Sequence, residues 1–146
     1  MRPLPVLTDP AFLILRVALA VVFIAHGWDD IETGVGTNVE NHRGAGIPLP
    51  EISAYFTAYM ELFGGILLAL GALTRLAASG LAFVMLGAWY FVHRGNGLFV
   101  DSGGSEFVLV LGAIAAALVL TGAGRFSIDR QISTWRSGRE HLARGR

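Results

Sequence analysis

Residues 48–75 read PLPEISAYFTAYMELFGGILLALGALTR, and the apolar part of this stretch, residues 52–73, contains one carboxylate, Glu61. A helical projection at 100° per residue puts small and polar residues on the side of Glu61 and bulky apolar residues opposite. Because lipid tails give helices no hydrophobic reason to associate, small residues mark the face that packs on other helices. The pattern predicts a membrane-spanning helix with Glu61 directed into protein. The small residues expected at its packing face are Ala58, Gly64, Gly65 and Ala69.

The composition of the whole chain is that of a membrane protein. Of its 146 residues, 53% are hydrophobic and 15% are charged, and the mean hydropathy of +0.58 is too high for a soluble domain of this size. The sequence contains no cysteine, which excludes disulfides, thiolate metal sites and a Cys-x-x-Cys electron relay. If the chain takes part in redox chemistry, another molecule must carry the electrons. We expect contact with the lipid bilayer and no nucleic-acid partner.

Four apolar runs predict four membrane-spanning helices within a single domain, residues 1–146. The predicted spans cover residues 11–28, 51–73, 76–93 and 105–123. The segments 29–50 and 94–104 are rich in glycine and are predicted to be outer loops, and residues 124–146 form a basic tail. The predicted fold class is therefore all-α, a membrane-embedded four-helix bundle with both termini on one side.

Arginine is distributed unequally between the two sides of the predicted bundle. Arg43 and Arg94 are the only arginines in the outer loops, whereas the N-terminus, the turn at Arg75 and the tail carry most of the others. The positive-inside rule then makes both termini cytoplasmic. One rough helical face of the tail is apolar, which predicts either contact with the anionic inner leaflet or a frayed basic end. The residues of that face are Ile128, Ile132, Trp135 and Leu142.

Two charged residues are predicted at mid-membrane depth. Arg16 lies roughly 18 Å below Trp28, and Glu61 lies roughly 15 Å below Glu51, at 1.5 Å per helical residue. An unpaired charge at this depth is costly, so the pattern favours an ion pair between Arg16 and Glu61. Two alternatives remain open. In the first, the long side chain of Arg16 extends so that its guanidinium reaches the nearby interface. In the second, Glu61 is a protonated carboxyl that is hydrogen-bonded to a neighbouring helix.

Three further polar residues, His26, His93 and Glu106, come at the outer ends of the first, third and fourth spans. Antiparallel packing would bring them to one level, beside aromatic side chains that supply apolar walls. This predicts a ligand-binding site for a polar headgroup, such as the carbonyls of a quinone. The alternative is capped helix ends with interfacial histidines. The aromatic residues assigned to the same site are Trp28, Trp89 and Tyr90.

The sequence gives no basis for assigning a catalytic residue or a metal site. Paired imidazoles can ligate haem and His/Glu clusters can hold a metal, but no spacing such as H-x-x-x-H fixes either geometry. A nucleophile, a base and an orienting group cannot be assembled either. We therefore expect neither haem nor metal, and a quinone or a lipid is the candidate ligand.

Several short stretches, taken in order, resemble the DoxX family of small bacterial membrane proteins, and the resemblance covers most of the chain. Relatives usually carry a lysine soon after a His-Gly pair, where this chain has Asp29-Asp30, so no role of that lysine transfers. The matching stretches are Arg16 with His26-Gly27, GIPLP at 46–50, Glu61 with Gly64-Gly65 and Gly71, Thr74-Arg75, residues 85–93, Gly104-Ser105-Glu106 and GAGRFSID at 122–129.

The resemblance implies a four-helix bundle in the bacterial inner membrane and a link to quinol oxidation and to oxidative, thiol or quinone stress. It favours an accessory or anchoring membrane subunit of a redox system that binds a quinone-like ligand, without stand-alone enzyme activity. One alternative is an oligomeric transporter of a small molecule or protons, in which Arg16, Glu61 and the histidines line a relay. Another is a structural scaffold for partner enzymes. The expected partners are proteins of a membrane redox complex or further copies of the chain.

Overall fold

The computed structural model describes residues 5–135, and within that range it contains only helices and the turns between them. The all-α class predicted from the sequence is confirmed. A last helix covers residues 128–135, while Leu142 and the four arginines after residue 135 lie outside the described residues. The other elements in chain order are α1 (Pro5–Glu32), α2 (Val35–Gly44), α3 (Pro50–Leu70), α4 (Thr74–Ala88), the π-helix η1 (Trp89–His93), the 3-10 helix η2 (Val100–Ser102) and α5 (Glu106–Thr121).

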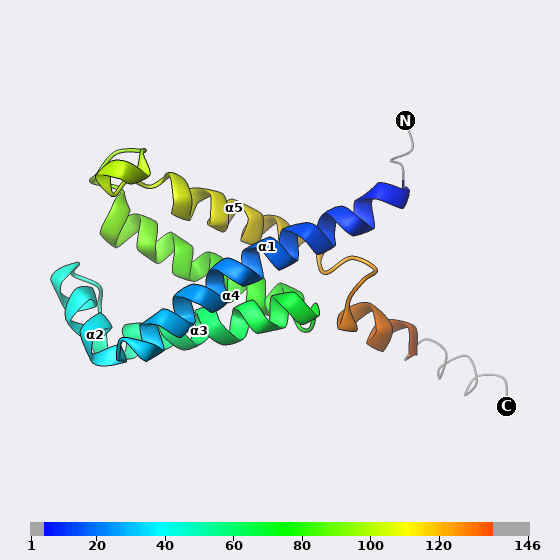
Figure 1. The fold of residues 1–146 in the computed structure, drawn as a ribbon, viewed down its shortest axis with the longest axis horizontal. Coiled ribbons are helices and arrows are strands. Elements are labelled where there is room, and N and C mark those ends of the chain that lie inside the picture. The colour runs from blue at the N-terminus through cyan, green and yellow to red at the C-terminus, as the bar shows by residue number, and fades with distance from the viewer. Residues whose placement is uncertain (1–4, 136–146) are drawn as a thin grey trace, which may run out of the picture.

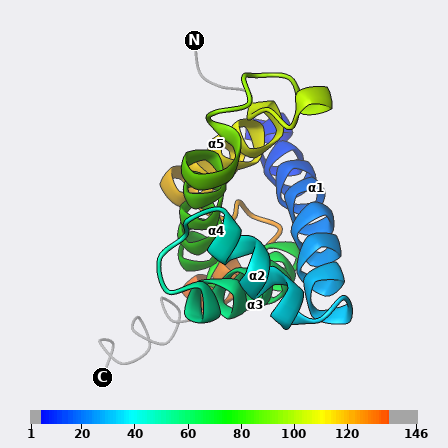
Figure 2. The same ribbon diagram turned by 90° about the vertical axis from the view of Figure 1, so that its left-hand side faces the viewer.

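The long helices pack as two pairs. α1 lies mainly along α3, α4 lies mainly along α5, and contacts between α3 and α4 join the pairs (Figure 1). The start of α1, the α3–α4 turn and residues 122–135 lie at one end, here called the terminal end. α2 and η2 lie at the opposite end, here called the loop end, where α2 covers part of α3 (Figure 2).

Three helical segments are long and apolar enough to cross a membrane: Thr8–Glu32, Pro50–Leu70 and Thr74–His93. α5 is apolar but has 16 residues, fewer than the 19 predicted for the fourth span at 105–123. At 1.5 Å per residue it is about 24 Å long, compared with a hydrocarbon core of about 30 Å. Residues 5–135 therefore contain three membrane-capable helices and a shorter apolar fourth.

Close contact between α1 and α3 depends on two glycines. A methyl group added to Gly27 would lie 2.8 Å from the carbonyl oxygen of Ala58 and closer still to the backbone nitrogen of Leu62. A methyl group added to Gly65 would lie 3.0 Å from the backbone nitrogen of Ile24. The two backbones are thus in contact, as small residues permit in membrane helices.

The faces of α3 differ in exposure. Ala58, Gly64 and Gly65 are buried, and large apolar residues on the opposite side, such as Phe63, are exposed. Ala69, which the projection assigned to the packing face, is exposed in the last turn of α3. Its carbonyl oxygen, rather than its side chain, makes the contact with α1, because it accepts a hydrogen bond from Arg16.

The predicted outer loop at 29–50 is largely helical, which corrects the sequence interpretation. α1 continues through Asp29 and Asp30 to Glu32, and α2 then occupies Val35–Gly44. The glycines of this segment predict a loop, but of them only Gly34, with φ of 95°, forms the turn between the two helices. α2 has no buried residue and lies on α3, so a polar helix covers the loop end of the protein.

Candidate ligand-binding site

A cavity of about 340 Å³ lies between α3 and α4, partly covered by α2 and the chain that follows it. We call it the Glu61 cavity. Three phenylalanines form much of its apolar wall, and four polar side chains from α2 and α3 reach it. Its lining residues are His42, Ile47, Pro48, Ser53, Phe56, Thr57, Glu61, Phe83, Val84, Gly87, Ala88, Phe91 and Val92.

Glu61 is 7% exposed and makes no hydrogen bond or ion pair with any residue that the structure describes. In the same part of the chain, Thr74 Oγ1 is the only fully buried side-chain polar atom without a partner. The carboxylate oxygens of Glu61 therefore keep contact with the cavity. The charge that acts on them is the carboxylate of Asp30, which has the same sign and offers no compensation. A buried carboxyl in this position is stabilised by a hydrogen-bond donor, and a ligand in the cavity would supply one.

His42 and Ser53 form the polar mouth of the cavity. His42 Nδ1 lies 3.0 Å from Ser53 Oγ, and the Ser53 hydroxyl donates to the carbonyl oxygen of Pro50 at 3.3 Å. In the tautomer that carries its proton on Nδ1, His42 donates to Ser53 and leaves Nε2 as an acceptor. Burial lowers the pKa of His42 below its ordinary value, although the carboxylate of Asp30 acts in the opposite direction. The imidazole is thus neutral at pH 7 and able to accept a hydrogen bond.

The wall formed by α4 changes helix type beside the cavity. Gly87 and Ala88 end the α-helical part, and Phe91 and Val92 belong to the π-helix η1. In η1 the backbone N–H of Arg94 bonds the carbonyl oxygen of Trp89 at 2.9 Å, one residue further than in an α-helix. Short π-helical turns are rare and are often found at functional sites. The widened turn supports the assignment of this cavity as the candidate site.

Arg16 and Glu61 do not form the predicted ion pair in the structure. The guanidinium of Arg16 donates to four backbone carbonyl oxygens: Leu68 at 2.8 Å, Ala69 at 3.2 Å, Ala123 at 2.6 Å and Phe126 at 2.9 Å. Leu68 and Ala69 are in the last turn of α3, where carbonyl groups lack helical partners and the helix dipole attracts cations. Leu68 follows Glu61 by seven residues, or about 10 Å along the helix. Neither snorkelling nor an ion pair describes this arginine, which is buried and bonded to backbone.

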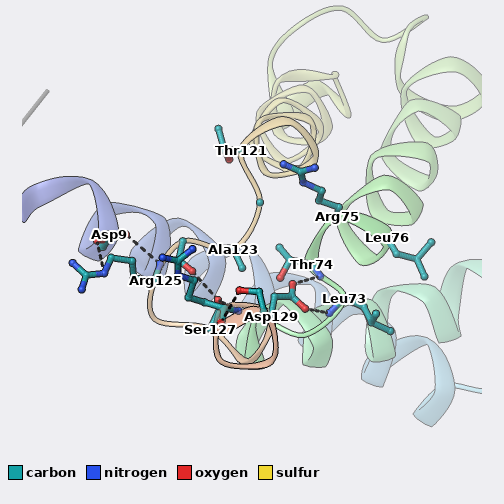
Figure 3. Close-up of a pocket in the computed structure, with 14 residues that line it drawn as sticks. Asp9, Leu73, Thr74, Arg75, Leu76, Thr121, Ala123, Arg125, Ser127 and Asp129 are labelled. Carbon is teal, nitrogen blue, oxygen red and sulfur yellow. Dashed lines mark hydrogen bonds and ion pairs between the residues drawn. The ribbon is translucent and has the colours of Figure 1, made fainter. Parts of the chain in front are cut away.

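Asp129 completes the same junction from the other side. Its two carboxylate oxygens accept the backbone N–H groups of Leu73 and Thr74 at 2.8 and 2.9 Å (Figure 3). Its own N–H donates to the carbonyl oxygen of Gly71 at 2.9 Å. Burial alone would raise the pKa of Asp129, but the hydrogen bonds from Thr74 and Leu73 and the charge of Arg16 lower it below its ordinary value. The residues after α5 therefore cap the start of α4.

The structure gives His26, His93 and Glu106 different partners, and no contact between two of the three occurs in the described chain. His93 Nδ1 lies 2.8 Å from the carbonyl oxygen of Gly103, so it bonds within its own loop. Glu106 accepts the backbone N–H of Val100 at 2.7 Å, also within that loop. The ring of His26 lies beside Phe107 at a centroid distance of 6.2 Å. None of the three lines the Glu61 cavity.

The aromatic residues assigned to that outer site likewise each make a different contact. Trp28 donates its ring N–H to Glu32 at 3.1 Å, and Tyr90 lies under the guanidinium of Arg94 at 3.8 Å. Trp89 lines an apolar groove between α4 and α5. Over residues 8–135, no group of three or more His, Asp or Glu side chains is arranged to hold a metal ion.

The sequence interpretation missed His42 and Ser53 as site residues. A signal for the site was nevertheless present, because Ser53, Thr57 and Glu61 follow one another at intervals of four residues and so lie on one face of α3. Their spacing marks a polar stripe that leads from the loop end to Glu61. His42 had no such signal, because its position depends on the unpredicted helix α2.

A model of the DoxX family matches residues 11–94, which include most of α1 and all of α2, α3, α4 and η1. An "Uncharacterized protein" of Haemophilus influenzae is 31% identical over 126 residues, which cover 84% of this chain and 91% of the relative. "Inner membrane protein YphA" of Escherichia coli is 30% identical over 124 residues, with 82% and 88% covered. "Putative oxidoreductase CatD" of Bacillus subtilis is 31% identical over 117 residues, with 80% and 83% covered. No solved structure shows a significant match.

The match to the family covers more than half of the chain, and the curated relatives align along most of their own length. The three membrane-capable helices agree with the name of the Escherichia coli relative, an inner membrane protein. On this evidence the chain is a bacterial inner membrane protein and belongs to the DoxX family.

Proposed function

We propose that the Glu61 cavity binds a quinone-like ligand and that the chain acts as an accessory membrane subunit of a redox system. The observation that carries this proposal is Glu61, which is buried, has no partner in the described chain and borders an apolar cavity. A carboxyl held in this way has its hydrogen-bonding capacity free for a ligand.

The chemistry of the cavity suits a flat ring with carbonyl or hydroxyl groups at its edge. Phe56, Phe83 and Phe91 supply apolar and aromatic contact for the ring. Glu61 in its protonated form donates to a quinone carbonyl, and in its ionised form accepts from a quinol hydroxyl. The volume of about 340 Å³ falls at the lower end of the range for small-ligand pockets, about 300–1,000 Å³.

The accessory role follows from what the chain can supply by itself. It has no cysteine, so electrons must come from a partner or from the ligand. The name of the Bacillus subtilis relative, an oxidoreductase, supports a place in a redox system. The expected partners are proteins of such a system or further copies of this chain.

The orientation belongs to the same proposal. α1, α3, α4 with η1, and α5 cross the inner membrane, with the terminal end in the cytoplasm. The support is the arginine distribution, since Arg75, Arg125 and Arg130 lie at the terminal end and only Arg43 and Arg94 lie at the loop end of the described chain.

Titration of the purified protein with a short-chain ubiquinone or menadione tests the ligand. Glu61→Gln keeps the shape of the side chain but removes its ability to ionise, and should weaken binding about tenfold, the effect of one charge-assisted hydrogen bond. Glu51→Gln is the matched control, because Glu51 lies on the same helix with its side chain 63% exposed. Equal binding by the wild type, Glu61→Gln and Glu61→Leu would contradict the proposal.

A further inference from the structure

A second cavity, of about 750 Å³, opens at the terminal end and shares no lining residue with the Glu61 cavity. We call it the terminal pocket. It lies between the α3–α4 turn, the end of α5 and the residues that follow α5 (Figure 3). Its charged lining residues are Asp9, Arg75, Arg125, Asp129 and Arg130.

The two acids of the terminal pocket are already engaged. Asp129 uses both carboxylate oxygens to cap α4, as described above. Asp9 accepts the backbone N–H of Arg125 at 3.1 Å and faces its Nε at 3.7 Å. Among the described residues, no carboxylate pairs with Arg75 or Arg130. Two of the three arginines of the pocket, Arg75 and Arg130, are therefore without a carboxylate partner in the described chain, and the buried charge of Arg16 lies close to Asp129.

Arg75 is positioned for an additional acceptor. Its Nη2 lies 3.4 Å from the carbonyl oxygen of Leu120, a long and therefore weak hydrogen bond. The guanidinium is placed over Gly122, where an added methyl group would lie 3.5 Å from Nε. Most of its five N–H donors have no partner among the described residues, and a planar fork of donors matches the oxygens of a phosphate group.

The same pocket has an apolar edge. Leu73 and Leu76 line it and are 60% and 69% exposed. In Figure 3 their side chains point away from the side on which Arg75 faces Thr121. A ligand with an anionic head and apolar chains would satisfy both edges, whereas a free anion would use only the arginines.

We propose that the terminal pocket binds the phosphate group of an anionic phospholipid headgroup, with Arg75 and Arg130 as the main phosphate contacts. Basic pockets at the ends of membrane helices are known to hold such headgroups. The lipid chains would lie along Leu73 and Leu76. This proposal is independent of the quinone-like ligand, because the two cavities have no residue in common.

Native mass spectrometry and thermal unfolding of the purified full chain test the lipid site. Phosphatidylglycerol should bind and raise the melting temperature. Phosphatidylcholine should bind more weakly and raise the melting temperature less. The double variant Arg75→Gln, Arg130→Gln should bind phosphatidylglycerol about tenfold more weakly, as expected for the loss of charge-assisted hydrogen bonds. Its melting temperature in phosphatidylcholine should equal that of the wild type, which excludes a folding defect.

The double variant Arg43→Gln, Arg94→Gln is the matched control, because it removes the same charge from the loop end. It should retain phosphatidylglycerol binding. If this control loses phosphatidylglycerol binding to the same extent as Arg75→Gln, Arg130→Gln, the loss reflects overall charge and contradicts the proposed site. Inorganic phosphate is the last arm of the test. If phosphate alone stabilises the protein as well as phosphatidylglycerol at the same concentration, a free anion rather than a lipid occupies the pocket, and the lipid assignment is wrong.

Discussion

Replacing Arg16 with leucine should destabilise the junction between α1, the end of α3 and the residues that follow α5. Four backbone carbonyl oxygens accept hydrogen bonds from the guanidinium of Arg16. The carbonyl oxygen of Leu68 also accepts a hydrogen bond from the N–H of Gly71. Those of Ala69, Ala123 and Phe126 have Arg16 as their only donor in the described chain. An unsatisfied buried acceptor costs about 1–3 kcal/mol, and the two partly buried carbonyls are at the lower end of that range.

The costs of the three unsatisfied carbonyl oxygens in Arg16→Leu add up to about 3–5 kcal/mol of unfolding free energy. This corresponds to a fall of about 10 °C in melting temperature for a protein of this size. Arg16→Lys keeps a charge but loses the planar fork of donors, so it should fall between the wild type and the leucine variant. Thermal unfolding in a fixed detergent, followed by circular dichroism, measures both. A fall of less than about 2 °C for Arg16→Leu would refute the reasoning.

The same assay separates this account from an ion pair with Glu61. Since Glu61 has no partner in the described chain, Glu61→Leu should leave stability unchanged or raise it. Because the two sites are about 10 Å apart and independent, the effects of the two single variants should add, so the double variant should be no less stable than Arg16→Leu alone. If Glu61→Leu is strongly destabilising, and the double variant is more stable than either single variant, the two charges form a couple and our assignment of Arg16 is wrong.

Three further predictions follow from the terminal junction, the helix contacts and the orientation. Asp129→Ala should lower the free energy of unfolding by about 1–2 kcal/mol at pH 7. Because the pKa of Asp129 is lower in the folded protein, this stabilisation is present above the unfolded pKa near 4 and is lost as pH falls through the folded pKa. A destabilisation by Asp129→Ala that stays constant down to about pH 2 would contradict this prediction. Gly27→Ala should lower the melting temperature strongly, whereas Gly36→Ala, with open space around it in α2, should be neutral or stabilising by up to about 1 kcal/mol; equal effects would argue against the α1–α3 contact. A membrane-impermeant thiol reagent should label Gly95→Cys but not Gln131→Cys in intact cells, and the reverse pattern would overturn the orientation.

The sequence was most informative where residue size alone decides the environment. On α3 the projection separated Ala58 and Gly64, which are buried, from Ile52 and Phe63, which are exposed. This works because bulky apolar side chains face lipid while small ones allow helix contact, and both properties are visible in the residue type. The same reasoning gave the direction of Glu61 into protein but not its surroundings.

The partners of Arg16 could not be predicted, because they are backbone carbonyls. Leu68 and Ala123 carry no sign in their side chains that their oxygens accept a guanidinium. α2 was missed for a related reason, since a short polar helix without a buried face leaves no periodic apolar pattern. Without α2, His42 could not be placed at the mouth of the Glu61 cavity. The capping role of Asp129 could not be predicted either, because its partners Leu73 and Thr74 precede it by 56 and 55 residues and only the fold brings them together.

The occupancy of the Glu61 cavity is the central claim, and filling the cavity tests it most directly. Gly87 lines the cavity and has no atom within 4 Å of an added methyl group, so Gly87→Phe can fill the space without a backbone clash. Gly95→Phe, which adds the same ring at an equally open position in the 94–104 loop, is the matched control. The measurement is mass spectrometry of quinones extracted from the protein after purification from bacterial membranes. Our account predicts quinone with the wild type and with Gly95→Phe, and none with a folded Gly87→Phe variant. Equal amounts of quinone with all three proteins would contradict it.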